Sequence, residues 1–461
     1  MKAGSCSQPP LPNWDTLIQP SQAPCLQSTL PGALSGRSAC RATHLTRRCP
    51  KTLMSHRPAP LSATTRRSIL LLSFATFSSM ASQRICDAML PELSRVFSAS
   101  LAQAAQVVSM FAVVYGLAQL FYGPMGDRLG KFRIITFATL ACSLGSVLAI
   151  FATSLNMLVL ARVMVAMGAA AIIPLSMAWI GDTVANNHLQ ETLARVGLGT
   201  TLGIVGGQLA GGLVTDVLGW RWVFAFMTVL FSIVGTLLYI DWRRQQATTV
   251  ANTAPPAADV ARPGFVAQAL SIVTGSWSRI VLLVAVIEGA VGFGVLAIWA
   301  SHLHRVHGLS LSASGAIVAL FGMGGMLYMA LARHLIRRFG EQGLASLGVC
   351  LLGLSALVVG FTPYWPLTVP ASLLGGFGFF MFHNTMQTNA TQMAPGARGT
   401  AVSLFASSLF LGQSVGVSLA AGLAERLGSG LVIALGGGLL AIVGLFFAQA
   451  LRRRDRVRPQ V

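Results

Sequence analysis

Three ionisable residues stand inside long apolar stretches of this sequence, where charges are otherwise rare. Asp87 lies in "QRICDAMLPEL", Arg162 in "LVLARVMVAMGAAAIIP" and Glu288 in "LLVAVIEGAVGFG". An ionisable side chain in apolar surroundings is costly and usually has a functional role. A carboxylate there can bind and release a proton, because burial favours its neutral form and a nearby arginine favours its charged form. These three residues are our candidates for proton-coupling chemistry.

The two acids, Asp87 and Glu288, differ in their sequence neighbours. Arg84 lies three residues before Asp87, so on a helix the two share a face and could simply neutralise each other. Glu288 has no neighbour of opposite charge, so we expect it to be unpaired and neutral near pH 7. The alternative is that Glu288 is a protonated, hydrogen-bonded packing residue.

A polar group in "FFMFHNTMQTNATQM" completes the candidate site. His383 could titrate near neutral pH, although such groups also serve as hydrogen-bonding contacts between helices. The other polar members of this group are Asn384 and Gln387. The remaining candidates to line a substrate cavity are Arg84, Tyr115, Phe293 and Trp299.

The elements that carry these residues are apolar runs of membrane-spanning length. The 461-residue chain is 54% hydrophobic and only 10% charged, against about 25% charged residues in an average soluble domain. Each run is about 19–24 residues long, enough to cross a bilayer as a helix. The sequence therefore predicts an all-α membrane protein with twelve transmembrane helices. The runs are 68–90, 103–122, 134–152, 157–180, 196–217, 221–241, 279–301, 311–333, 343–361, 367–388, 400–423 and 429–450.

The runs fall into two sets of six, separated by "TTVANTAPPAADVARP". Sequence echoes between the sets, such as "GGLVTDVLG" and "AGLAERLG", predict two six-helix pseudo-repeats with a site between them. The N-terminal tail, residues 1–65, is rich in Ser, Pro and Arg. We expect it to be disordered or not native, with Met54 as an alternative start. The predicted segments are tail 1–65, bundle 66–241, cytoplasmic linker 242–277, bundle 278–451 and basic tail 452–461.

The formal charge of +19 comes from 32 Lys and Arg against 13 Asp and Glu. These basic residues lie in short segments between apolar runs, which suits membrane topology better than nucleic-acid binding. Their distribution predicts that both termini are cytoplasmic in a multi-pass protein of the cell membrane. The seven cysteines show no metal-binding spacing, and we expect no metal or other cofactor.

The stretch "FYGPMGDRLGKFR" interrupts two apolar runs with a compact polar turn. It resembles a loop pattern of the major facilitator superfamily, G-x-x-x-D-R/K-x-G-R/K-R/K, and in particular that of the twelve-helix drug:proton antiporter branch. The final basic position is Phe132 here. Charges for topology alone would not predict the acid in the middle of the turn. The matching residues are Gly123, Asp127, Arg128, Gly130 and Lys131.

Two further patterns resemble this branch with changes. Arg162 matches the arginine of its fourth helix, while Val165 replaces a glutamine. The fifth helix, "GIVGGQLAGG", resembles G-x-x-x-G-P-x-x-G-G, but Gln208 stands where proline belongs. Its glycines at a spacing of four would also permit close packing of another helix. The glycines assigned to helix packing are Gly199, Gly203, Gly207, Gly211 and Gly212.

The resemblance implies roles for some of these residues. Asp87 and Arg162 would pair near the outer side of the membrane. Asp127 would lie against the start of a helix near Gly399, and Arg128 would reach Asp182. These contacts, with Gly123, Gly130 and Lys131, would form a cytoplasmic gate that opens and closes during transport.

The sequence therefore predicts a secondary transporter, not an enzyme, that exchanges protons for a small organic solute and exports it. The proton gradient would be the driving force, and the protein would act as a monomer in the lipid bilayer. An importer of a metabolite in the same superfamily is the nearest alternative, because Gln208 and the altered fourth helix depart from the antiporter patterns. Alternatives of another class are a membrane-embedded enzyme and a non-transporting sensor.

Overall fold

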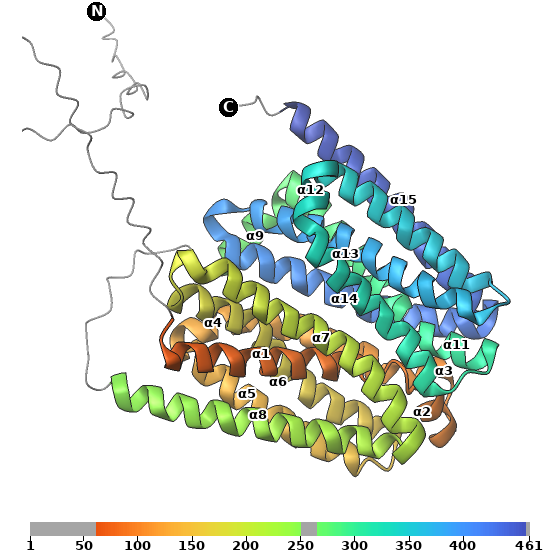
Figure 1. Ribbon diagram of the computed structural model, residues 1–461, viewed down its shortest axis with the longest axis horizontal. Helices are drawn as coiled ribbons and strands as arrows, with labels where there is room; N and C mark the ends of the chain where they lie inside the picture. Colours follow the sequence, from red (N-terminus) through yellow and green to blue (C-terminus); the bar gives the residue numbers. More distant parts are fainter. Residues whose placement is uncertain (1–60, 250–264, 458–461) are drawn as a thin grey trace, which may run out of the picture. The chain divides into compact units, whose positions relative to one another are not determined.

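The computed structural model describes residues 61–249 and 265–457, and all regular elements in these ranges are helices (Figure 1). Helices are expected of an apolar chain in lipid, since a helix satisfies its own backbone hydrogen bonds. The predictions for residues 1–60, including the start at Met54, lie outside the described residues. So does most of the stretch "TTVANTAPPAADVARP".

For the description below, the N-terminal half means residues 61–249 and the C-terminal half means residues 265–457. The first contains α1 (Ala63–Arg84), α2 (Leu90–Val96), α3 (Leu101–Ala104), α4 (Gln106–Leu129), α5 (Lys131–Ile150), α6 (Leu155–Thr183), α7 (Asn186–Leu218) and α8 (Trp220–Thr249). The second contains α9 (Phe265–Thr274), α10 (Ser276–Glu288), η2 (Gly289–Gly294), α11 (Trp299–His307), α12 (Leu311–Phe361), η3 (Trp365–Leu367), α13 (Thr368–Gln392), η4 (Pro395–Ala397), α14 (Arg398–Leu427) and α15 (Ser429–Val457).

Ten helical segments within the described ranges are long and apolar enough to cross a membrane. One of them, α12, has 51 residues and contains Gly340 at φ 63° and ψ 178°, where two helices meet at a kink. At 1.5 Å per residue, 51 residues would extend about 77 Å, far more than one crossing of ~30 Å. The predicted runs 311–333 and 343–361 are thus the two arms of α12. The first predicted run, 68–90, overlaps most of α1 but continues past its end at Arg84, and the many Ser and Thr residues of α1 lower its hydropathy.

The polar stretch from Phe121 to Arg133 is less of a turn than the sequence suggests. Helix α4 continues through Pro124 to Leu129, and α5 begins at Lys131. Only Gly130 separates them, with φ at 90°, a conformation that glycine adopts without steric cost. The expected hinge is therefore a single residue.

Helices also occupy most of the described parts of the predicted linker and C-terminal tail. Helix α8 continues past the predicted boundary at 241 to Thr249, and α9 lies directly before α10. Helix α15 likewise continues past 451 to Val457.

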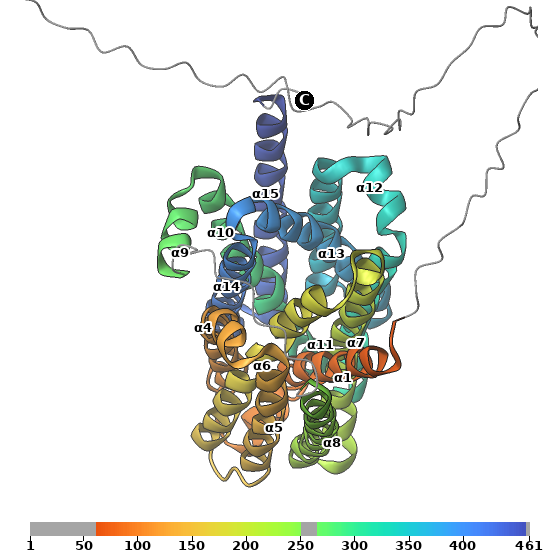
Figure 2. The same ribbon diagram turned by 90° about the vertical axis from the view of Figure 1, so that its left-hand side faces the viewer.

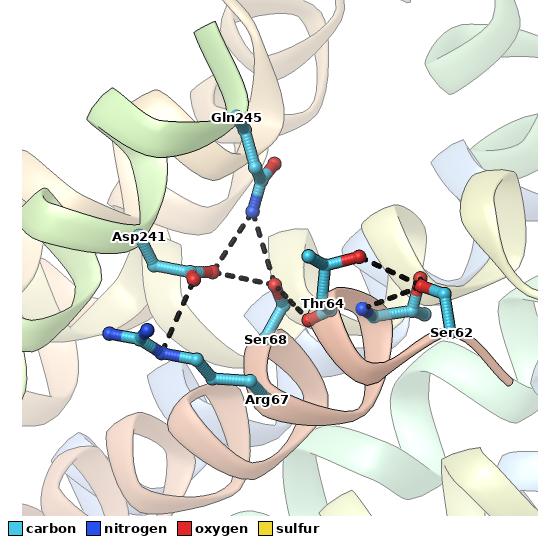
Figure 3. Close-up of polar contacts among 7 residues, drawn as sticks. Ser62, Thr64, Arg67, Ser68, Asp241 and Gln245 are labelled. Carbon is cyan, nitrogen blue, oxygen red and sulfur yellow. Dashed lines mark hydrogen bonds and ion pairs between the residues drawn. The ribbon is translucent and has the colours of Figure 1, made fainter. Parts of the chain in front are cut away.

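A buried acid fastens α8 to the start of α1 (Figure 3). The Asp241 carboxylate accepts hydrogen bonds from Ser68 Oγ at 2.6 Å and Gln245 Nε2 at 3.0 Å, and lies 3.5 Å from Arg67 Nε. The Ser62 hydroxyl accepts from the Thr65 N–H and caps α1. These contacts fix the helix that carries Arg84 within its own half.

Helix α1 packs against α7 and α8 (Figures 1 and 2). The glycines of α7 face the α1 backbone so closely that added methyl groups would meet its carbonyl oxygens. Gly199, Gly203, Gly207 and Gly211 face, in that order, Ser73, Phe77, Ala81 and Ile85. The fifth glycine of this group, Gly212, instead faces the Leu311 carbonyl of α12. The regular spacing places α7 and α1 in contact over three helical turns.

Candidate functional site

Asp87 lies in a break between α1 and α2. Helix α1 ends at Arg84, and α2 begins with Pro91 in its first turn. Within the break, the Asp87 N–H donates to the Arg84 carbonyl at 3.2 Å. The Asp87 side chain is fully buried, so its charge depends on the groups that surround it.

Two donors meet the Asp87 carboxylate on the same oxygen. Gln208 Nε2 donates to Oδ2 at 2.9 Å, and Arg84 Nη1 lies 3.5 Å from Oδ2. The glutamine that replaces the expected proline of α7 is therefore a partner of the candidate proton-binding acid. In the sequence, Gln208 stands out only as a departure from the proline-containing pattern of this helix. Its one available signal was a polar amide within a glycine-rich apolar run.

The expected ion pair between Asp87 and Arg162 is not formed. The Arg162 guanidinium donates to Ser82 Oγ at 3.2 Å and the Val107 carbonyl at 3.4 Å, and lies 4.2 Å from the centre of the Phe111 ring. Within the described ranges, no carboxylate lies at ion-pair distance from it. Arg84 takes the position that we expected for Arg162, because it approaches Asp87 from the preceding turn of the same chain segment.

Glu288 is buried but not unpaired as expected, because its Oε1 lies 2.8 Å from Nδ1 of His383 on α13. This pair joins residues 95 positions apart in the sequence. A hydrogen bond between a carboxylate oxygen and an imidazole nitrogen requires a proton between them. The pair can therefore hold one proton, either on Glu288 Oε1 or on His383 Nδ1.

Phenylalanines surround the imidazole of His383. Phe379 stacks on it at 5.7 Å between ring centres, and the predicted cavity residue Phe293 lies 6.2 Å away. Phe380 and Phe405 also lie near the ring. This apolar surrounding limits the partners available to His383 and strengthens its contact with Glu288.

A π-helix, η2, follows Glu288 directly. Its glycines lie against α14, where a methyl group on Gly289 would meet the Leu409 carbonyl and one on Gly294 would meet the Gly416 backbone. Single wide turns of this kind are frequent at functional sites. Here the wide turn lies between Glu288, at the end of α10, and α11.

We call Asp87 with Arg84 and Gln208 the Asp87 cluster, and Glu288 with His383 the Glu288 cluster. Side chains from the two halves meet between these two clusters. The Arg84 guanidinium lies 4.3 Å from the centre of the Phe293 ring, and Gln83 Nε2 donates to Gln413 Oε1 at 3.4 Å. Tyr115 packs edge-on against Phe410 at 4.5 Å. The Asp87 cluster and the Glu288 cluster are thus connected through Arg84 and Phe293.

The other predicted cavity residues lie apart from this connection. Trp299 is buried and its ring contacts Phe321. Asn384 donates to the Tyr328 hydroxyl at 2.9 Å, and Gln387 is exposed. Of the predicted group on α13, only His383 joins the candidate site.

Several buried polar atoms at the site have no hydrogen-bond partner among the described residues. An unsatisfied buried donor or acceptor is costly, and both types occur here. A proton or a polar solute that enters the site could satisfy them. The atoms are Arg84 Nε, Asp87 Oδ1, Arg162 Nη2, Gln208 Oε1, Glu288 Oε2 and Gln413 Nε2.

The predicted gate residues form a cluster centred on a lysine. Lys131 Nζ lies 2.8 Å from Asp127 Oδ1 and 2.7 Å from Asp182 Oδ2. Lys131, and not Arg128 as expected, therefore reaches Asp182. No hydrogen bond or ion pair within the described part of the chain joins Asp127 to α14, and its side chain is 69% exposed.

The flanking gate glycines also differ in their surroundings. Gly130 supplies the turn between α4 and α5, while a methyl group on Gly123 would meet no atom within 4 Å. Only the first of the two is therefore required by the local backbone.

The all-helical bundle, with its apolar spans and buried ionisable residues, defines a multi-pass membrane protein. The family model of the Major Facilitator Superfamily matches residues 72–417, and the chain belongs to this superfamily. Membership places it among transporters of small molecules and not among enzymes.

Two relatives named as multidrug transporters match part of the chain. It is 28% identical over 181 residues to the probable multidrug resistance protein EmrY of Escherichia coli K12, and 25% identical over 179 residues to the multidrug export protein EmrB of the same strain. Each match covers 39% of this chain and about a third (35%) of the relative's length. A longer match, 25% identical over 387 residues, covers 82% of this chain and 93% of the uncharacterized transporter YgaY of Escherichia coli O157:H7.

Solved structures share the fold at low sequence identity. A bacterial homolog of the human lysosomal transporter Spinster, in an inward-facing and unoccupied conformation, matches with a TM-score of 0.65 and 18% identity over 85% of this chain and 96% of that one. The nucleoside transporter NupG gives a TM-score of 0.64 and 12% identity over 84% of this chain and 99% of that one.

Proposed function

We propose that this protein is a proton-coupled secondary transporter that moves a small organic solute by alternating access and exports it in exchange for protons. The observation that carries the proposal is the contact between two buried acid clusters, one in each half, through Arg84 and Phe293. Buried ionisable residues at membrane depth are typical of proton pathways. The names of EmrY and EmrB support the export direction.

The proposed topology has twelve crossings, six in each half, with both termini in the cytoplasm of a cell-membrane protein. Length and hydropathy identify ten segments in the described ranges, with α12 counted once. The second arm of α12 and the span containing α1 bring the proposed number to twelve. The end of the bundle at Lys131 is then cytoplasmic, and the end at α2, α3 and α11 is external. This orientation follows the basic residues.

The Asp87 cluster offers a physical route from a proton to a movement of the halves. A proton on Asp87 would cancel the charge that holds Arg84 and accepts from Gln208. Arg84 would then be free to move from the Phe293 ring, which belongs to the other half. Protonation at one buried carboxylate would in this way change a contact between the halves.

The Glu288 cluster would hold a second exchangeable proton. Its carboxylate and the His383 imidazole can share that proton without either group leaving its helix. A solute that contacts Phe293 would lie beside both clusters, so its binding and proton release can be linked. No cofactor takes part in this scheme, and a monomer suffices.

A proton-coupled importer is the second candidate. The observation that favours it is the Gln208–Asp87 hydrogen bond at 2.9 Å, because the amide replaces the proline that the export branch has in α7. A glutamine that donates a hydrogen bond to the coupling acid would act differently from a proline that bends the helix, so the two patterns need not share a transport direction.

Membrane vesicles with a defined pH gradient test the proposal. In inside-out vesicles with an acidic lumen, addition of a transported compound from a panel should release protons from the lumen. Uptake of a compound together with protons by right-side-out vesicles would instead establish the importer. If neither preparation coupled any compound to protons, the proposed function would be wrong.

A further inference from the structure

We propose that Asp216 and Glu425 are a matched pair of positioning residues that hold the two halves together at one end of the bundle and must both release during transport. The description of this end as external rests on the proposed function. The contacts themselves are seen in the structure and do not depend on that proposal. Neither acid belongs to the candidate gate or to the buried clusters.

Asp216 lies in the last turn of α7 and binds the first turn of α12. Its carboxylate accepts from the Ser312 N–H at 2.6 Å, the Ser312 hydroxyl at 2.5 Å and the Leu311 N–H at 3.3 Å. These N–H groups have no partner within their own helix, because they belong to its first turn. The acid comes from the N-terminal half and the bound helix from the C-terminal half.

Glu425 makes the reciprocal contact. It lies in the last turn of α14 and accepts from the Leu101 N–H at 2.5 Å and the Ala102 N–H at 3.3 Å. Leu101 begins α3, the start of the apolar span Leu101–Leu129. Here the acid comes from the C-terminal half and the bound helix from the N-terminal half. We call the two interactions the paired end contacts.

The paired end contacts use equivalent positions in the sequence. Each acid stands three residues before a glycine that ends its helix, Gly219 with φ at 95° and Gly428 with φ at 88°. These are the "TDVLG" and "AERLG" segments of the sequence echo. Each bound helix also starts alike, with a serine cap followed by leucine: Ser100 and Leu101, Ser310 and Leu311.

Helix electrostatics favour the closed arrangement of this end. A carboxylate at the C-terminal end of its own helix faces partial negative charge, whereas the N-terminus of another helix offers partial positive charge. Each acid is therefore more stable against its partner helix than alone. Both side chains are also partly open to solvent, so the contacts can break and re-form without burying a bare charge.

At the opposite end, the contacts of Lys131 and those of Asn389 and Gln342 each remain within one half. Lys131 joins Asp127 and Asp182 in the N-terminal half. In the C-terminal half, Asn389 accepts from Arg454 and Gln342 donates to Asp455. The paired end contacts thus close the end at α3 and α12, and alternation requires their loss.

Distances between spin labels on the two halves test this inference. Val96 on α2 and Val306 on α11 are exposed at this end and can be replaced by cysteine in the full chain after Cys350 and the tail cysteines are changed to serine. Purified protein in lipid nanodiscs should give mainly a short distance. Asp216→Asn combined with Glu425→Gln should raise the ratio of long to short distances at least about tenfold, which corresponds to a shift of about 1.4 kcal/mol in the equilibrium, and each single change should raise it less.

Glu92→Gln is the matched control, because Glu92 pairs with Arg95 within α2 at 2.7 Å and that pair does not join the halves. It should leave the distances unchanged. Unchanged distances in both single variants would overturn the inference even if the double variant failed to fold. The measurement needs neither solute nor a proton gradient, so an inactive transporter would refute the proposed function without affecting this test.

Discussion

Asp87 and Glu288 are both fully buried acids, but their partners differ in one chemical respect. Asp87 meets Arg84 and Gln208, while Glu288 meets His383. An arginine keeps its charge at any ordinary pH, whereas a histidine can lose its proton near neutrality. The first cluster therefore contains a fixed positive charge that needs an anion, and the second can be neutral as a whole.

Because of this difference, we expect loss of the Asp87 charge to lower the stability of the protein, and loss of the Glu288 charge to affect proton exchange alone. Removing the charge of Asp87 would leave Arg84 buried without its anion, which is destabilising. Removing the charge of Glu288 would leave the His383 imidazole beside a neutral amide, which can still form a hydrogen bond with it. We therefore expect the two acids to respond differently to the same kind of substitution.

The largest effect is expected for Asp87→Asn. Loss of one partner of a buried ion pair should lower the free energy of unfolding by about 3 kcal/mol or more, and solute-driven proton release should stop. Thermal unfolding in detergent and the vesicle assay measure the two effects. Asp182→Asn is the control, because Asp182 is 62% exposed and its loss should cost no more than about 1 kcal/mol. Equal destabilisation by both changes would contradict the comparison.

Glu288→Gln should act on transport and not on stability. Because the amide can still bind His383, we expect the free energy of unfolding to change by about 1 kcal/mol or less. Solute-driven proton release should be lost, while exchange of labelled for unlabelled solute across the membrane continues. Glu341→Gln is the control, because Glu341 accepts from Asn389 away from the site, and it should keep proton release. Intact proton release in Glu288→Gln would show that Asp87 alone carries the coupling.

The smallest effect on proton release is expected for Gln208→Leu, which removes one donor from Asp87 at similar volume. Arg84 still binds the carboxylate, so stability should fall by about 1 kcal/mol. Solute-driven proton release should become weaker but remain measurable in vesicles. If Gln208→Leu abolished it as completely as Asp87→Asn, the amide and not Arg84 would control the state of Asp87.

The sequence predicted local features of this protein better than contacts between distant segments. Apolar length predicted the helices, and the four-residue spacing of glycines predicted close packing on α7, since both depend on neighbouring residues. The Glu288–His383 pair could not be predicted, because nothing local relates α10 to α13. The resemblance assigned Arg128 to Asp182, but charge alone does not distinguish Arg128 from Lys131, and in the structure Lys131, the first residue of α5 after Gly130, makes the contact.

The π-helix η2 has a consequence for how the span α10–α11 can move. A π-turn holds one residue more than an α-turn, and α-helical geometry assigns about 100° of rotation and about 1.5 Å of rise to each residue. If the wide turn migrated along the span, each residue that it passed would change the face it presents by about that angle. Glu288 borders η2, so a one-residue slip of the register would turn its carboxylate away from His383 while both ends of the span stayed in place.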